Sequence, residues 1–255
     1  MDNIVAEIKK KRELADIPDD LVRDELVKYI KKHNIILPVE KKSTKLIVKS
    51  LRAELRRYSG QYSLSSKSKK DRLLSSQNFK ELLNHHSSTK ERIKDYPLLR
   101  NIISKINPKS ILDLGCGLNP LAIASKGVFY HAYDIKSEDL NIVSAFFAAN
   151  DISGDVHNAD IRNIIKFPEV DLCLILKVLD ILGINKIELS KKFLSKIKSK
   201  TFIVSFATHT LSGKKMNRPY RRWFEQLLDE RKEKYEIVRT YQEIFYIITK
   251  SKERQ

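Results

Sequence analysis

In SILDLGCGLNPLA (residues 110–122), an apolar run turns sharply on two glycines and resumes as a predicted helix. Ile111–Leu114 predicts a buried strand that ends at Gly115 and Gly117. Because these residues have no β-carbon, the backbone can turn tightly there and come close to a ligand. The stretch therefore predicts a nucleotide-cofactor loop in an α/β sheet. The alternative is an ordinary left-handed turn after a core strand.

The loop has the pattern GxG and lacks the third glycine of a dinucleotide site. A ligand that contains adenosine without a pyrophosphate needs close backbone approach but less of an anion cradle. The pattern thus favours S-adenosylmethionine over NAD as the cofactor.

Short apolar runs alternate with longer mixed segments after Ser110, as expected for a parallel sheet with crossover helices. The last two runs lie close enough together to form a hairpin. The fold class is therefore predicted as α/β, a Rossmann-like class I methyltransferase with a seven-stranded sheet and an N-terminal helical domain. The predicted strands are Ser110–Leu114, Val128–Tyr133, Gly154–His157, Asp171–Leu176, Thr201–Ser205, Tyr235–Thr240 and Ile244–Thr249.

The chain carries 49 Lys and Arg against 32 Asp and Glu, a formal charge of +17, which favours a polyanionic partner. Nucleic acid is the leading candidate, because no amphipathic helix with large apolar anchors points to a membrane surface. No apolar run is long enough to span a membrane, and the N-terminus lacks a signal sequence, so we expect a cytoplasmic protein. Cys116 and Cys173 lack metal-ligand spacing, and we expect both to be reduced and the chain to have no metal site.

The N-terminal excess of positive charge lies in residues 41–72, which hold 11 basic and 2 acidic side chains. Helices are predicted at Asn3–Leu14, Asp19–Lys32 and 43–58, and the third has an apolar face of Ile47, Leu51 and Tyr58. Its cations fall on another face and predict RNA contact, with a solvated helix face as the alternative. The predicted RNA-binding residues are Lys45, Lys49, Arg52, Arg56, Arg57, Lys67, Lys69 and Lys70.

Ionisable residues follow three of the predicted strands, where ligands of doubly wound sheets bind. Asp134 ends the second strand and is predicted to accept the ribose hydroxyls, unless it only caps the next helix. After the third strand, Asp160 would accept the adenine amino group while Ile161 packs on the ring. Lys177 follows the fourth strand and either faces the methyl-transfer centre or is a solvated strand end.

Histidines and hydroxyls precede a predicted helix in HHSSTKER (residues 85–92). The adjacent histidines lack the spacing of a zinc site. A hydroxyl at 87–89 is predicted to cap the helix, with Glu91 at capping-box distance from Ser88. Arg92 is placed to pair with the carboxylate of the methionine part of the cofactor.

Several motifs in this order resemble one family, the 16S ribosomal RNA guanine-N7 methyltransferases that confer aminoglycoside resistance. They are HSSTKER at 86–92, SILDLGCGLNPLA at 110–122, YHAYDI at 130–135, LILKVLDIL at 174–182, and SF with LSGK and RRWFE between 205 and 225. The resemblance covers about residues 40–255. It implies a basic, helical RNA-binding domain at 1–88, a methyltransferase domain at 89–255, S-adenosylmethionine as cofactor, and a guanine in the decoding centre of the small ribosomal subunit as target.

The resemblance also implies roles for individual residues. The cofactor pocket would be formed by His86, Ser87, Ser88, Arg92, Gly115, Gly117, Asp134, Asp160, Ile161 and Leu176. Apart from the resemblance, the candidates for positioning the target base are Lys177, Lys214, Lys215, Arg221 and Arg222, with Tyr220 or Trp223 for stacking, although Trp223 suits the core better. The chain departs from the family at Ala207 and Asp180, where proline is common.

Guanine N7 carries a lone pair and no proton, so we expect no general acid or base. We expect a monomer whose partner is 16S rRNA in the small subunit. Two alternatives remain, a methyltransferase acting on tRNA or a different rRNA site, and a ribosome assembly factor that keeps the fold without turnover.

Overall fold

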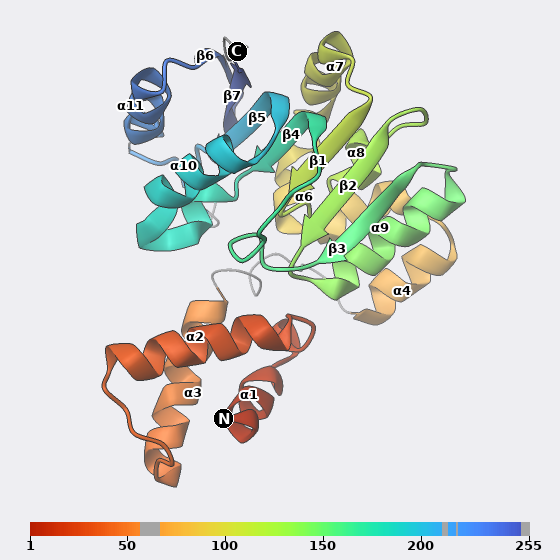
Figure 1. Cartoon of the computed structure of the whole chain (residues 1–255). Coiled ribbons are helices and arrows are strands. Elements are labelled where there is room, and N and C mark those ends of the chain that lie inside the picture. Colours follow the sequence, from red (N-terminus) through yellow and green to blue (C-terminus); the bar gives the residue numbers. More distant parts are fainter. Residues whose placement is uncertain (57–66, 211–213, 218, 251–255) are drawn as a thin grey trace.

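The computed structural model describes residues 1–56, 67–210, 214–217 and 219–250, and its strands form one mixed sheet (Figure 1). The strand order is β3-β2-β1-β4-β5-β7-β6. The first five strands are parallel, whereas β7 runs antiparallel to both β5 and β6. The strands are β1 (Ser110–Leu114), β2 (Phe129–Asp134), β3 (Gly154–Asn158), β4 (Val170–Leu176), β5 (Ser199–Ala207), β6 (Lys234–Arg239) and β7 (Glu243–Thr249). The predicted fold class and the terminal hairpin are confirmed.

Alternating side chains of the strands separate two hydrophobic layers. Ile111 and Leu174 pack on one face of the sheet, while Leu112 and Ile175 pack on the other. The first layer holds α7 (Tyr96–Ile106), α8 (Pro120–Ile123) and α9 (Ser137–Ala149), and the second holds η3 (Leu179–Asn185), α10 (Lys186–Lys196) and α11 (Arg222–Glu230). No helix in the described ranges is long and apolar enough to cross a membrane.

The N-terminal helices form their own hydrophobic core, below the sheet in Figure 1. They are α1 (Asp2–Lys9), the 3₁₀ turn η1 (Arg12–Leu14), α2 (Asp19–Lys32) and α3 (Lys41–Leu55). The helix expected over Asn3–Leu14 therefore breaks after Lys9. Ile47 and Leu51 are buried as predicted, and Tyr58 lies outside the described residues.

The segment between these helices and β1 packs on the sheet. It contains α4 (Lys67–Ser75), α5 (Phe79–Leu82), η2 (Leu83–His85) and α6 (Ser87–Arg92). Leu73, Leu82 and Leu83 belong to the same hydrophobic layer as Ile111. We propose that the boundary between the two units lies between residues 56 and 67, earlier than the expected boundary at residue 88.

The connection from β3 to β4 lacks the usual crossover helix. Residues 159–169, all of which the structure describes, form turns and irregular backbone. Phe167 from this connection packs against Tyr133. Within the described residues, no helix of this connection covers the ends of the sheet at β2 and β3, and Asp155 and His157 on β3 stay 42% and 40% exposed.

Candidate cofactor and RNA sites

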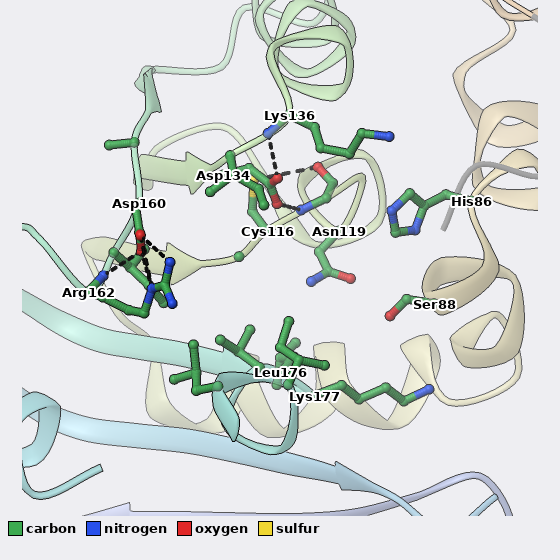
Figure 2. Close-up of a pocket in the computed structure, with 18 of the residues that line it drawn as sticks. His86, Ser88, Cys116, Asn119, Asp134, Lys136, Asp160, Arg162, Leu176 and Lys177 are labelled. Carbon is green, nitrogen blue, oxygen red and sulfur yellow. Dashed lines mark hydrogen bonds and ion pairs between the residues drawn. The ribbon is translucent and has the colours of Figure 1, made fainter. Parts of the chain in front are cut away.

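A pocket lies at the carboxyl ends of β1 to β4, where the sequence predicts the cofactor (Figure 2). One side of it carries Asp160 and Arg162, the opposite side His86 and Ser88, and Asp134 lies between them. The predicted cofactor residues that line it are His86, Ser88, Gly115, Gly117, Asp134, Asp160, Ile161 and Leu176.

The glycine loop has the conformation that the sequence predicts. Gly115 has φ +68° and Gly117 has φ +48°, values that favour glycine. A β-carbon on Gly115 would lie 2.6 Å from Val178 Cγ2, and one on Gly117 would lie 3.1 Å from His86 Cε1. The loop therefore leaves no room for side chains beside the pocket.

Asp134 is held by backbone donors on both sides. Its Oδ2 accepts from Gly117 N at 2.8 Å and its Oδ1 from Lys136 N at 2.9 Å (Figure 2). Burial and the nearby charge of Asp139 raise the pKa of Asp134 to about 6, against the effect of these two donors. The carboxylate is fixed in place and retains lone pairs for further donors such as ribose hydroxyls.

Asp160 binds Arg162 in addition to facing the pocket. Arg162 Nη2 lies 2.7 Å from Asp160 Oδ2 and 3.1 Å from Glu25 Oε1, which belongs to α2. Leu21 of the same helix lines the pocket together with Ile135 and Ile161. The N-terminal unit thus contributes to this end of the pocket, which the sequence did not indicate.

Further contacts join the N-terminal unit to the sheet domain. Asp24 Oδ2 accepts from Asn163 Nδ2 at 2.8 Å, and the Asp16 carbonyl accepts from Ser137 Oγ at 3.2 Å. These contacts lie on the loops that carry Asp160 and on the start of α9. They hold α2 against the adenine end of the predicted site.

The expected capping box before Arg92 is wrong. His86 occupies the N-cap of α6 without a side-chain cap, and Thr89 Oγ1 donates instead to the carbonyls of Leu83 and His86. Ser88 remains at the pocket, whereas Ser87 does not line it. Burial lowers the pKa of His86 to about 4, so its ring is neutral at pH 7.

Arg92 is fully buried behind the pocket and does not line it. Its Nε and Nη2 donate to the two oxygens of Glu243 at 2.7 and 3.1 Å, and its Nη1 donates to Asn119 Oδ1 at 2.6 Å. Burial opposes the charge of Arg92, but the Glu243 carboxylate outweighs it and raises the pKa of Arg92. In this structure Arg92 therefore supports the pocket wall through Asn119.

Lys177 lines the pocket at the end of β4 and adopts φ +63°. Its Nζ lies 2.7 Å from Glu91 Oε2 and 3.2 Å from Glu243 Oε1, and the side chain is 13% exposed. The alternative of a solvated strand end is wrong. Lys177 joins the ion pair of Arg92 and Glu243 to the open side of the pocket.

Among the other candidates for positioning the target base, Arg221 is structural. It is buried, and its guanidinium pairs with Asp180 at 2.6 Å and donates to the Ala207 carbonyl at 3.2 Å. Arg221 therefore contacts both positions at which the chain departs from the family, Asp180 and Ala207. Lys214, Lys215, Arg222 and Tyr220 are exposed, and Trp223 packs against the hydrophobic core.

The basic face of α3 divides into two halves. All four cations line a groove between α1 and α3, and Lys45 and Lys49 are exposed there. Arg52 donates to the backbone carbonyls of Glu7 and Ile8, and Arg56 Nη2 pairs with Glu13 at 2.7 Å. The prediction that all four cations face outward is therefore wrong for Arg52, whose side chain is 17% exposed, whereas the side chain of Arg56 is 42% exposed beside Glu13.

Lys70 was also predicted to bind RNA but is 1% exposed. Its Nζ lies 3.3 Å from Asp139 Oδ1 and 3.5 Å from Glu138 Oε1. Lys70 is thus a buried counter-ion beside the pocket, whereas Lys69 is exposed. Arg57 and the side chain of Lys67 lie outside the described parts of the structure.

The two halves of the basic face predict different losses. In Lys45→Ala/Lys49→Ala, the salt dependence of RNA binding should fall by a slope of at most about 1.8, since each phosphate contact contributes at most ~0.9. In Arg52→Ala, the melting temperature should fall while that slope stays within error. Filter binding at several salt concentrations and thermal denaturation measure the two effects. An unchanged slope in the lysine pair would exclude those side chains from the RNA contact.

Sequence reasoning missed several residues of the site, which are Leu21, Asn119, Lys136, Arg162 and Glu243. Asn119 was already visible in the glycine-loop motif, and Lys136 and Arg162 each lie two residues after a predicted carboxylate. Nothing in the sequence pattern pointed to Leu21 or Glu243.

The chain is similar to known ribosomal RNA methyltransferases. The family model described as "Ribosomal RNA methyltransferase (FmrO)" matches residues 71–247. The chain is 30% identical over 182 residues, 70% of its length, to a 16S rRNA (guanine(1405)-N(7))-methyltransferase of Serratia marcescens, of which 72% is covered. A protein of the same name from Frankia casuarinae is 28% identical over 64% of the chain and 61% of its own length.

Solved structures share the whole architecture. The 16S rRNA methylase RmtB is 26% identical, with a TM-score of 0.77 over 98% of both chains. The 16S rRNA methyltransferase RmtF, solved with S-adenosyl-L-homocysteine, has a TM-score of 0.83 over 98% of both chains at 23% identity, and supports the fold alone.

Proposed function

Because the chain belongs to the FmrO family of ribosomal RNA methyltransferases, we propose that it transfers a methyl group from S-adenosylmethionine to N7 of a guanine in 16S rRNA. The observation that carries this proposal is the pocket at the carboxyl ends of β1 to β4. The curated relatives from Serratia and Frankia carry names that state this reaction. Through the same reaction the enzyme would confer aminoglycoside resistance.

The residues present fit the cofactor. At Gly115 and Gly117 no side chain covers the backbone beside the pocket. A β-carbon on Gly115 would meet Val178, and one on Gly117 would meet His86. Asp134 offers carboxylate oxygens for ribose hydroxyls. Asp160 and Ile161 would hold the adenine, while Ser88, Asn119 and Lys177 remain for the amino-acid part.

S-adenosylmethionine, when bound, supplies an electrophilic methyl group on sulfur. The chain has to position the guanine, because N7 presents its lone pair without losing a proton. No side chain is therefore assigned as a general acid or base. Holding the reacting atoms about 3 Å apart and in line supplies several kcal/mol of the barrier reduction.

RNA would reach this site across a basic surface. Lys45 and Lys49 on α3 and the exposed Lys214, Lys215 and Arg222 are the proposed contacts. A guanine in folded rRNA has to leave its stack to reach a pocket, and exposed Tyr220 is the proposed stacking partner. We propose that the enzyme acts as a monomer on the assembled small subunit.

Methyl transfer to three acceptors tests the proposal. Labelled S-adenosylmethionine is incubated with the enzyme and small ribosomal subunits, protein-free 16S rRNA or tRNA, and the modified base is mapped. We expect label at a guanine N7 of the decoding centre, with assembled subunits preferred. Label in tRNA, or at another rRNA site, would support the alternative RNA substrate.

A matched control tests whether transfer depends on the cofactor pocket. The variant Asp134→Asn should lose the label, while Glu236→Gln on the exposed face of β6 should keep it. Cofactor binding without any transfer would favour a ribosome assembly factor and contradict the proposed reaction.

A further inference from the structure

The face of the sheet that lacks a crossover helix carries three potential metal ligands. On β2, Tyr130 and Ala132 point into the first hydrophobic layer, so His131 and Tyr133 point to the other face. On β3, Val156 packs against that first layer, so Asp155 and His157 share the face of His131. Their side chains are 17%, 42% and 40% exposed, for His131, Asp155 and His157 respectively.

Strand register brings the three side chains together. Asp155 and His157 are two residues apart on one strand, and His131 lies directly opposite Asp155 on the neighbouring strand. His131 Nδ1 and His157 Nε2 each lie 2.9 Å from Asp155 Oδ1, and the three ligand atoms are within 4.8 Å of one another. Two ligands two residues apart on a strand, with a third across the ladder, can face one ion.

We propose that His131, Asp155 and His157 bind one divalent transition-metal ion, with Zn²⁺ as the best match. Two imidazoles and one carboxylate are typical ligands of this ion, which leaves a fourth position for water. Tetrahedral Zn²⁺ with bonds of about 2.0–2.1 Å separates its ligand atoms by about 3.3 Å. The observed separations of 2.9 Å need only a small opening of the cluster.

Neighbouring rings restrict the two imidazoles. The ring of His157 is stacked on Tyr133, with centroids 4.2 Å apart and planes 18° from parallel. The ring of His131 packs beside Phe129 at 4.8 Å. Both rings therefore lose little freedom when they bind an ion, which favours binding.

The ion would join the edge strand to the rest of the sheet. β3 is the outermost strand, and its only strand neighbour in the described structure is β2. The residues after β3, from Ala159 to Arg162, line the cofactor pocket, whereas the three ligands do not. The site is therefore separate from the methyl-transfer site, and metal binding should stabilise the strand that leads into the pocket.

The sequence predicts no metal site, because the cysteines and the paired histidines at 85–86 lack ligand spacing. The competing explanation of the cluster is that Asp155 simply accepts hydrogen bonds from both rings. The two explanations differ in whether the cluster binds a metal ion, because a ring nitrogen that donates to Asp155 must first pass its proton to the other ring nitrogen or to solvent.

Metal titration of the full-length, tag-free protein tests the proposal. After treatment with EDTA, Zn²⁺ is titrated by calorimetry in two buffers of different ionisation enthalpy, and Co²⁺ is titrated by visible absorption. We expect one Zn²⁺ per chain in both buffers, a tetrahedral Co²⁺ spectrum, and a higher melting temperature with Zn²⁺.

The variants His131→Gln and His157→Gln should each weaken Zn²⁺ binding at least about 100-fold and abolish the Co²⁺ spectrum. The control is His33→Gln, which removes an exposed imidazole at the C-terminal end of α2 and should bind Zn²⁺ with wild-type affinity. If the variants have wild-type circular dichroism and wild-type Zn²⁺ affinity, or if the wild type binds no Zn²⁺, the proposal is wrong. Neither readout depends on methyl transfer.

Discussion

Replacing Asp134 by asparagine is expected to weaken binding of S-adenosylmethionine by about 100-fold at pH 7.5. The carboxylate accepts from Gly117 N and Lys136 N and is the proposed acceptor of the ribose hydroxyls. Hydrogen bonds to a charged group contribute about 1.5–3 kcal/mol each, and a factor of 100 in affinity corresponds to about 2.8 kcal/mol. The amide NH₂ of asparagine would also face a backbone donor. Isothermal titration calorimetry measures the loss.

The same carboxyl group makes cofactor binding sensitive to pH. Burial and the charge of Asp139 raise the pKa of Asp134 to about 6, although its two backbone donors act in the opposite direction. The ionised form binds the hydroxyls, so protonation weakens binding as the pH falls through about 6. Between pH 7 and pH 5 the affinity of the wild type should decrease about tenfold, and the affinity of Asp134→Asn should not change.

A second buried carboxyl provides the control. Asp113 has a pKa raised to about 7 by burial, accepts from Tyr130 at 2.7 Å and does not line the pocket. The variant Asp113→Asn should keep the pH dependence of the wild type. A pH dependence that persists in Asp134→Asn and disappears in Asp113→Asn would show that Asp113 causes the effect and would contradict our assignment to Asp134.

The strands could be predicted because local patterns determine them. β1 begins and ends where the apolar run at 110–114 does, and the other strands lie within a few residues of their predicted limits. Nearly all side chains of β1, β4 and β5 are buried, so these strands appear as short apolar runs between polar segments. The terminal hairpin followed from the short spacing between its two runs.

Pairing between distant residues could not be predicted. Spacing along α3 correctly places Lys45, Lys49, Arg52 and Arg56 near one face of the helix, but it does not show which carboxylates or carbonyls come near that face. Arg56 meets Glu13, which lies 43 residues earlier, and Lys70 meets Asp139, which lies 69 residues later. An excess of positive charge therefore overestimates the number of cations that are available to RNA.

The same limit applies to the cofactor site. The roles of the glycines and the strand-end carboxylates could be predicted from the sequence, because these roles depend only on the strand and loop that carry each residue. The contributions of Leu21 and Glu25 depend on how α2 docks against the loop after β3. Since that docking joins two separate cores, no periodicity within either segment encodes it.

Replacing Glu243 by glutamine is expected to lower the free energy of unfolding by about 3 kcal/mol. Glu243 is fully buried and accepts from Arg92, Lys177 and Ser205 Oγ, the last at 2.7 Å. Removing one partner of a buried ion pair costs about 3–5 kcal/mol, because the remaining charge stays buried without compensation. Glutamine keeps one acceptor oxygen, which favours the lower end. For a chain of this size we expect the melting temperature to fall by about 6–12 °C.

Two comparisons establish that the loss comes from the uncompensated charge. Glu236→Gln, on the exposed face of β6, should leave stability unchanged. The double variant Arg92→Met/Glu243→Leu removes both charges and should recover much of the stability, since apolar pairs of similar volume replace buried ion pairs at little cost. If the double variant is less stable than Glu243→Gln, packing rather than charge determines the effect.

The pH dependence of this loss has a defined sign. Burial raises the pKa of Glu243, but the charges of Arg92 and Lys177 outweigh it, and the net pKa lies below the ordinary value of 4.5. The ionised carboxylate therefore stabilises the folded state above pH 4.5, and this contribution is lost as the pH falls through the lower folded-state pKa. The difference in stability between the wild type and Glu243→Gln, measured by urea denaturation, should accordingly be constant between pH 6 and 8 and shrink below pH 4.5. A difference that grows on acidification would show that Glu243 is protonated in the folded enzyme, and that Arg92 is then balanced by another group.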